Sequence, residues 1–203
     1  MILKKLINQL WKKGNRNQTM NPSETALIVI DVQERLTKAI PENADLLVNI
    51  KKLIEGFKIL DINIFFTEQN PTKLGVTLEE ITRGLEVIKF SKMDFSVLGC
   101  NDLLKSIKKK KIQHLIICGI ETHVCVLQSS LDLAKAGFNI HVIADATKSR
   151  NLLDQEIALL RLRQFGIQIS TVETTIFELC RTSKSNKFKA ISKLIKNSNP
   201  SKI

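Results

Sequence analysis

Cys125 is the residue of this 203-residue chain with the clearest capacity for chemistry. It lies in the stretch GIETHVCVLQSS, residues 119–130, directly after the apolar run HLIIC, where a predicted strand passes into a predicted helix. A helix N-terminus and a nearby ammonium both lower the pKa of a thiol and so favour the nucleophilic thiolate. The alternative interpretation is that Cys125 is only a small buried residue at the start of a helix.

Two other residues could complete a nucleophilic site with Cys125. Asp31 follows the apolar run ALIVI, and Lys92 lies just past EVIKF. A carboxylate at a neighbouring strand end can take the thiol proton, and an ammonium beside it keeps both anions ionised. In the alternative interpretation Asp31 caps the next helix, Lys92 is solvated and Cys125 is packed. The catalytic hypothesis requires the three functional groups to lie within about 5 Å of one another.

The remaining sequence offers little other chemistry. His123 lies two residues before Cys125, so within one helical turn their side chains would point about 200° apart. His114 and His141 sit in or beside expected strands, as surface or core histidines do. No histidines or carboxylates repeat at metal-ligand spacing near a strand end, and neither GxGxxG after the first strand nor a Walker loop occurs. We therefore expect no metal and no cofactor.

Short apolar runs alternate with helical patterns from Ala26 onward. The expected strands are ALIVID, INIFFTE, EVIKF, QHLIICGI, FNIHVIAD and QIST, and the expected helices cover about residues 43–60, 100–110, 123–136 and 153–165. This alternation predicts an α/β fold of three layers, α/β/α, around a mostly parallel sheet. Ligands bind beyond the carboxyl ends of such strands, where the candidate groups are Asp31, Glu68, Gln69, Asn70, Lys92 and residues 119–125.

The net charge of +11 belongs to the two ends of the chain. Residues 1–20 hold five basic residues and residues 181–203 hold seven, with no acidic residue in either, which leaves 19 basic against all 20 acidic residues in 21–180. The body therefore has no basic excess with which to follow a phosphate backbone, and no nucleic-acid partner is expected. A nucleic-acid-directed protein that uses its basic tails stays an open alternative.

Residues 1–20 are predicted to be a basic amphipathic extension, separate from a domain over 21–203 that includes a basic C-terminal helix. One helical face carries Leu3, Leu6, Ile7, Leu10 and Trp11. A transit peptide, a docking helix, and residues upstream of a start at Met20 all fit this pattern. No apolar run approaches the length of a membrane span, and four cysteines without CxxC spacing favour a reducing compartment. We expect a cytoplasmic location, with organelle import through the extension if the source is eukaryotic.

Five segments, in this order and spacing, carry a resemblance to a known family. They are ALIVIDVQERL, FFTEQNPTKLG, KFSKMDFSVL, ICGIETHVCVLQSSLDLAKAGFNIHVIADATKSR and RLRQFGI. Over about residues 24–195 the chain resembles the isochorismatase-like cysteine hydrolases, with isochorismatase domain-containing proteins as the nearest likeness. The resemblance implies a six-stranded parallel sheet of order 3-2-1-4-5-6. It also implies a catalytic triad that matches Asp31, Lys92 and Cys125.

The resemblance extends to the surroundings of the triad. It implies a cis peptide bond between Ile120 and Glu121, and we expect the backbone N–H groups of Glu121 and Cys125 to form an oxyanion hole. The expected substrate pocket consists of Gln33, Gln69, Asn70 and Phe95. It further implies a homo-oligomer, and we expect residues 173–196 in the interface because Phe188, Ile191, Leu194 and Ile195 form an apolar stripe that needs a cover. Packing of this stripe against the chain's own sheet is the alternative.

Departures from the family narrow the expected activity. Nicotinamidases of this superfamily bind a metal through an aspartate and two histidines after the second strand, whereas TEQNPTKLG has no histidine. Asp94 occupies a position beside the pocket where relatives often carry a basic or neutral residue. We expect a metal-independent cysteine hydrolase that acts on a small amide-like substrate through a thioester. A non-catalytic interaction protein that keeps the fold is the other alternative.

Overall fold

The fold, described for residues 20–197 by a computed structural model, is built on one six-stranded parallel sheet. The strands are β1 (Thr25–Ile30), β2 (Asn63–Gln69), β3 (Ile88–Lys92), β4 (His114–Ile120), β5 (Asn139–Lys148) and β6 (Gln168–Ser170). Their order in the sheet is β3-β2-β1-β4-β5-β6, and every pair of neighbours is parallel. The predicted topology is confirmed.

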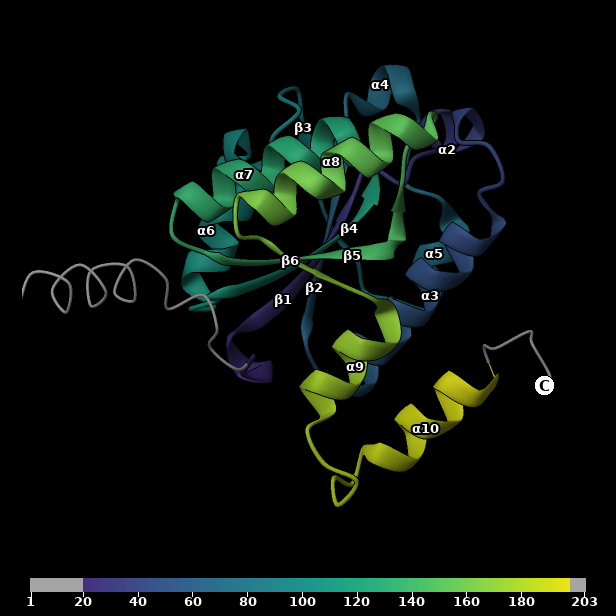
Figure 1. Ribbon diagram of the computed structural model, residues 1–203, viewed down its shortest axis with the longest axis vertical. Coiled ribbons are helices and arrows are strands. Elements are labelled where there is room, and N and C mark those ends of the chain that lie inside the picture. Colours follow the sequence, from purple (N-terminus) through teal and green to yellow (C-terminus); the bar gives the residue numbers. More distant parts are fainter. Residues whose placement is uncertain (1–19, 198–203) are drawn as a thin grey trace, which may run out of the picture.

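Helices cover both faces of the sheet (Figure 1). One layer contains α6 (Asn101–Lys109), α7 (Leu127–Lys135) and α8 (Leu152–Gln164), and the other contains α3 (Ala44–Ile59), α9 (Val172–Cys180) and α10 (Phe188–Asn197). Shorter elements join them: η1 (Pro22–Glu24), α2 (Glu34–Ala39), α4 (Pro71–Leu74), α5 (Glu79–Thr82), η2 (Val97–Gly99) and the π-helical turn η3 (Thr122–Val126). The three-layer α/β/α architecture agrees with the alternation of apolar runs in the sequence.

The central strand β1 shows why the sequence folds into three layers. All six of its residues are buried, because helices cover both faces of a parallel sheet. Leu27 and Val29 pack into the core beneath α3 and α9, whereas Ile28 and Ile30 pack into the core beneath α6 and α7. The period of two along the strand thus divides its side chains between two cores and fixes the carboxyl end of β1, where Asp31 follows.

Two expected element boundaries differ from the structure. β3 ends at Lys92 rather than at Phe90, because its ladder with β2 continues to the pair of Gln69 and Lys92. The helix expected over 123–136 begins as the wide turn η3, in which the Val126 N–H donates to the Glu121 carbonyl, five residues back, at 3.2 Å. Regular α-helix starts only at Leu127, so Cys125 lies in the wide turn and not in an ordinary first turn.

The apolar stripe near the C-terminus is covered within the chain, which corrects the expectation that it needs a second subunit. Ile191 and Ile195 of α10 are buried, and Phe188 and Leu194 pack against the same core. The helix lies against α3 and α9 (Figure 1). Nothing in this stripe therefore argues for an oligomer interface over residues 173–196.

Other predictions concern the ends of the chain and its surroundings. The amphipathic extension falls outside the described residues, apart from the buried Met20. Within residues 20–197 no helix has both the length and the apolar character that crossing a bilayer requires. All four cysteines are free and buried, and the cytoplasmic location stays a prediction.

Two buried histidines at the amino ends of β4 and β5 predict a loss of stability in acid. The ring centroids of His114 and His141 are 6.0 Å apart, and burial, with a like charge on His114, lowers the pKa of His141 to about 4. The unfolded chain takes up this proton near pH 6.5, so the free energy of unfolding should fall by about 3 kcal/mol between pH 6.5 and 4. Urea unfolding across this range should show the fall, and His141→Leu should remove most of it. An unchanged slope in the variant would contradict this origin.

Candidate active site

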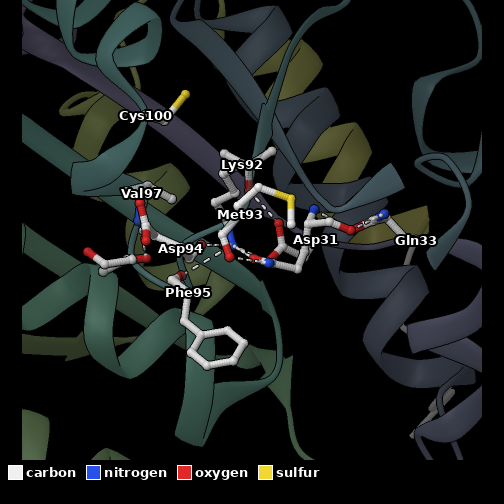
Figure 2. A network of polar contacts seen from close by, with 12 residues as sticks. Asp31, Gln33, Lys92, Met93, Asp94, Phe95, Val97 and Cys100 are labelled. Atoms are coloured by element: carbon white, nitrogen blue, oxygen red, sulfur yellow. Dashed lines mark hydrogen bonds and ion pairs between the residues drawn. The ribbon is translucent and has the colours of Figure 1, made fainter. Parts of the chain in front are cut away.

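The centre of the site is an ion pair between Asp31 and Lys92, buried at the carboxyl edge of the sheet. Lys92 Nζ lies 2.7 Å from Asp31 Oδ2, and both side chains are at most 1% exposed. Asp31 follows β1 and Lys92 ends β3, so the two residues meet across the end of β2, as Figure 2 shows. The 61 residues between them in sequence are bridged by the strand order alone.

Thr67, near the end of β2, makes hydrogen bonds to both the backbone and the side chain of Asp31. The Asp31 N–H donates to the Thr67 carbonyl at 3.1 Å, and the Thr67 hydroxyl donates to Asp31 Oδ1 at 2.7 Å. Asp31 also has a φ of 52°, in the left-handed region that residues other than glycine seldom adopt. Such a conformation persists where the surroundings enforce it, which here directs the carboxylate along the edge of the sheet.

Lys92 is surrounded by oxygen atoms. Besides Asp31, its ammonium donates to Gln69 Oε1 at 2.7 Å and lies 3.3 Å and 3.2 Å from the carbonyls of Asp94 and Phe95. Gln69 completes its own hydrogen bonding through Nε2, which donates to the Met93 carbonyl at 2.7 Å. The ammonium is therefore fixed in position by the loop that follows β3 (Figure 2).

The turn that carries Cys125 is brought to the ion pair by a close approach of β4 to β1. Gly119, with φ of 114°, lies beside Ile30, and a Cβ atom at Gly119 would come 2.1 Å from the Ile30 carbonyl oxygen. Only glycine fits at that distance. The chain then passes through a cis peptide bond between Ile120 and Glu121 and enters η3.

Cys125 lies beside the ion pair. The residue is 5% exposed, and its thiol is near enough to Asp31 and Lys92 for both charges to act on its pKa. Burial raises the pKa of the Cys125 thiol to about 12; the Asp31 carboxylate adds to this rise and the Lys92 ammonium opposes it. The expectation that a helix N-terminus lowers this pKa is wrong, because desolvation disfavours the thiolate more strongly. The resting group is a thiol at neutral pH.

The end of β5 supports the cysteine turn from the other side. The Thr147 hydroxyl donates to the Gly119 carbonyl at 2.8 Å and lies 3.0 Å from the Thr122 hydroxyl. Arg150 pairs with the Glu121 carboxylate, Nε to Oε1 at 2.8 Å. These contacts fix the backbone on both sides of the cis bond. The Glu121 carboxylate is held by its ion pair with Arg150.

His123 takes no part in a cysteine–histidine pair. Its Nδ1 lies 2.9 Å from the Ser149 hydroxyl, and its N–H approaches the same oxygen at 3.4 Å. Asp31 and Lys92, not His123, are the charged groups that act on the pKa of Cys125.

Two of the four expected pocket residues, Gln33 and Asn70, use their side chains for other contacts, and Phe95 borders a hollow beside the site rather than the ion pair. Gln33 is fully buried: its Nε2 donates to the carbonyls of Gln69 and Gly75, and its Oε1 accepts from the Gln69 N–H. Asn70 begins α4, and its Oδ1 accepts from the Thr72 hydroxyl. The Phe95 ring is 52% exposed and points away from the ion pair (Figure 2).

Each departure has a simple cause. A buried glutamine amide must satisfy several hydrogen bonds, and the nearest groups for Gln33 are backbone ones. Asn70, with φ of 39°, adopts the left-handed conformation that asparagine tolerates at the start of a short helix. Phe95 contributes its carbonyl to Lys92 rather than its ring. Of the four expected pocket residues, Gln69 is the one whose side chain bonds directly to the ion pair.

Sequence reasoning missed the supporting residues Thr67, Thr147 and Ser149. Thr67 lies near the carboxyl end of β2, and Thr147 and Ser149 lie at the end of β5, on the same edge of the sheet as Asp31. Polar residues at the ends of buried strands were the signal that could have found them. Within residues 20–197, His, Cys, Asp and Glu form no group of three or more that could hold a metal ion.

The Gln33 contacts predict a large structural role for this side chain. Gln33→Leu removes three hydrogen bonds and leaves two carbonyls and one N–H unpaired in the interior. The free energy of unfolding should fall by about 3 kcal/mol, measured by urea denaturation. Gln113→Leu, at an exposed position, is the control and should change it by less than about 0.5 kcal/mol. Equal effects of the two substitutions would contradict the role of Gln33.

Comparisons with known proteins agree with the geometry. The isochorismatase domain model matches residues 25–174. A secreted isochorismatase effector of Phytophthora sojae is 37% identical over 182 residues, 86% of each chain. Isochorismatase domain-containing protein 1 of Danio rerio is 34% identical over 181 residues, which are 89% of this chain and 64% of that protein. The structure of MAR1 ribonuclease from Caenorhabditis elegans has a TM-score of 0.84 at 36% identity, covering 91% of this chain and 95% of that one. The chain therefore belongs to the isochorismatase family, as its motifs predicted.

Proposed function

We propose that this protein is a cysteine hydrolase that cleaves the C–N bond of a small amide through a thioester on Cys125. The observation that carries the proposal is the buried Asp31–Lys92 pair, 2.7 Å apart, with both charges near enough to act on the pKa of the Cys125 thiol. A desolvated carboxylate beside a thiol is a general base, and the ammonium beside it offsets the charge that burial would otherwise disfavour. Membership in a hydrolase family supports the same reaction class.

The reaction begins when the Cys125 sulfur attacks the carbonyl carbon while its proton passes to Asp31. The C–N bond then breaks, and the leaving amine takes the proton from Asp31. A water molecule next gives a proton to Asp31 and attacks the thioester, which releases the carboxylic acid and restores the thiol. Because the thiol pKa is raised to about 12, proton transfer accompanies the attack rather than preceding it as a stable thiolate.

The oxyanion of each tetrahedral intermediate is assigned to the backbone N–H groups of Glu121 and Cys125. Both belong to the turn that Thr147 and Arg150 hold in place. Donors fixed before reaction cost no reorganisation when the negative charge develops, and one such donor contributes a factor of roughly 10² to 10³ in rate. The assignment requires a substrate carbonyl between this turn and the ion pair.

The access route suits a compact substrate. Beside the site, the loop after β3 and α7 enclose a hollow of about 570 Å³, with Met93, Phe95 and Gln128 among its walls. Gln128 lies three residues beyond Cys125, so the hollow borders the cysteine turn. Met93 is 71% exposed, and its thioether provides an apolar contact for a small ligand at the entrance. Asp94 and Asp132 also line the hollow, so the proposed substrate is a small amide without negative charge.

The test is a panel of small primary amides, with release of ammonia and of the matching acid as the readouts. At least one amide should turn over with the wild type and none with Cys125→Ala. Cys180→Ala, which removes another buried free cysteine on α9, is the matched control and should stay active. Intact-mass spectrometry of the quenched wild type should show the acyl adduct on Cys125. Turnover by Cys125→Ala would refute the thioester route.

The name of the Caenorhabditis elegans relative, a ribonuclease, makes RNA cleavage a competing function. The site geometry favours the amide, because a thiol–carboxylate pair attacks a carbonyl carbon, which a phosphodiester lacks. The body of the chain also has no basic excess, with 19 basic against 20 acidic residues in 21–180. Cleavage of single-stranded RNA by the wild type, abolished in Cys125→Ala, would favour the ribonuclease over our proposal.

A further inference from the structure

Helix α8 presents an apolar face to solvent on the side opposite its own core. Ala158 and Leu162 are buried against the sheet, whereas Leu153, Ile157 and Leu160 are 62%, 48% and 51% exposed. At about 100° per residue the three exposed side chains fall within about 60° of arc, nearly opposite the buried pair. We call these three residues the α8 stripe. Figure 1 shows α8 beside α7 in the layer that covers this part of the sheet.

The charged residues on the two sides of the α8 stripe follow a simple pattern. Glu156 and Arg163 lie on one side, and Asp154 and Arg161 lie on the other. All four are exposed, and within residues 20–197 none of them takes part in an ion pair. On each side the acid is near the start of the helix and the base is seven residues later. Seven residues span two turns, so the two charges are too far apart to pair within one helix.

This pattern is complementary to itself in one arrangement. Consider two copies of α8 that pack antiparallel about a two-fold axis. Each row of charges on one helix then lies beside the same row on the other helix, and the two rows run in opposite directions. Glu156 then faces Arg163 of the second copy, and Asp154 faces Arg161 of the second copy. The α8 stripes meet between these two rows of charges. An apolar centre with a polar rim is the usual anatomy of a protein interface.

The surface beside α8 can extend the contact. A groove of about 730 Å³ runs between α8 and the sheet edge at β6, with Leu160, Arg163 and Gln168 among its walls. β6 is the last strand of the sheet and is three residues long. A helix of 13 residues is about 20 Å long, and the groove widens the surface that a second copy could cover beside it.

We propose that the α8 stripe is the interface of a two-fold symmetric dimer, in which α8 packs antiparallel against α8 of a second copy of this chain. The interface replaces the one expected over residues 173–196. It also places a second chain against the helix that packs on the turn η3, which carries Cys125. Asp31, Lys92 and Cys125 all come from one chain, so the dimer can be tested separately from the hydrolase activity.

Sedimentation of the full 203-residue chain between about 1 and 100 μM tests the dimer. The wild type should sediment as a dimer or an even multiple, and Ile157→Glu should raise the dissociation constant at least thirtyfold, the loss expected for a buried interface residue. Val48→Glu, at a position 46% exposed on α3, is the matched control and should assemble as the wild type does. A wild type that stays monomeric at 100 μM, or an Ile157→Glu variant that assembles normally, would refute the proposal. In either case the α8 stripe has another occupant or none.

A charge exchange tests the antiparallel arrangement separately. Glu156→Arg and Arg163→Glu should each weaken association about tenfold, because each places like charges opposite one another across the axis. The double variant restores both pairs and should associate within about threefold of the wild type. Because all four natural cysteines are buried, Ile157→Cys should also give a covalent dimer with a short bismaleimide. Failure of the double variant to recover, or of the cysteine variant to cross-link, would overturn this arrangement.

Discussion

Asp31→Asn should lower kcat/KM for the amide substrate by about 10³ and make the remaining activity rise with pH. The Cys125 thiol has a pKa raised to about 12, chiefly by burial, so a base must remove its proton during the attack. A positioned base contributes roughly 10² to 10⁴ in rate. Asparagine keeps the size of the side chain and its contact with Thr67 but accepts no proton at neutral pH.

The pH profile distinguishes this role from a structural one. Without Asp31 the reaction depends on free thiolate, which increases tenfold with each pH unit while the pH stays below the thiol pKa. Between pH 7 and 9 the Asp31→Asn activity should therefore rise about a hundredfold, and that of the wild type should rise far less. Asp102→Asn, an exposed carboxylate on α6, should keep the wild-type profile. A variant with a flat, uniformly reduced profile would indicate misplacement of the cysteine instead of loss of a base.

The fold could be predicted because its signals are local. The alternation of short apolar runs with helical patterns gave the βα units, and the complete burial of β1 and β4 explains why those runs are continuous rather than alternating. The resemblance supplied the order of the strands. Given that order, Asp31 and Lys92 must lie close together. Asp31 follows β1 and Lys92 ends β3, and these two strands flank β2.

The details that could not be predicted depend on contacts between distant segments. The apolar stripe of α10 reads as exposed until α3 and α9 are seen to cover it. In α8 the sheet buries only Ala158 and Leu162, and Leu153, Ile157 and Leu160 stay exposed. Local patterns show that a face is apolar, but only the packing shows what covers it. The raised pKa of Cys125 has the same origin, because desolvation is a property of the assembled site.

The second large effect is expected for Lys92→Met, and it concerns stability as well as rate. Lys92 is the only cation within hydrogen-bonding distance of the Asp31 carboxylate among the described residues, and methionine of similar length would leave that buried charge with the Thr67 hydroxyl. Breaking a buried pair from one side typically costs about 3–5 kcal/mol, because the uncompensated charge remains. Asp31→Asn should cost less, since the Lys92 ammonium keeps Gln69 and the carbonyls of Asp94 and Phe95 as acceptors.

Urea unfolding at pH 7 should therefore rank the wild type first, Asp31→Asn second and Lys92→Met last. Lys105→Met, which breaks an exposed pair with Asp102, is the control and should change the free energy of unfolding by less than about 1 kcal/mol. The double variant Asp31→Asn/Lys92→Met removes both charges at once and should be more stable than Lys92→Met alone, because no buried ion is then left without a partner. A double variant less stable than either single one would mean that the two side chains contribute mainly through packing, and that the charge on Asp31 is not what Lys92 offsets.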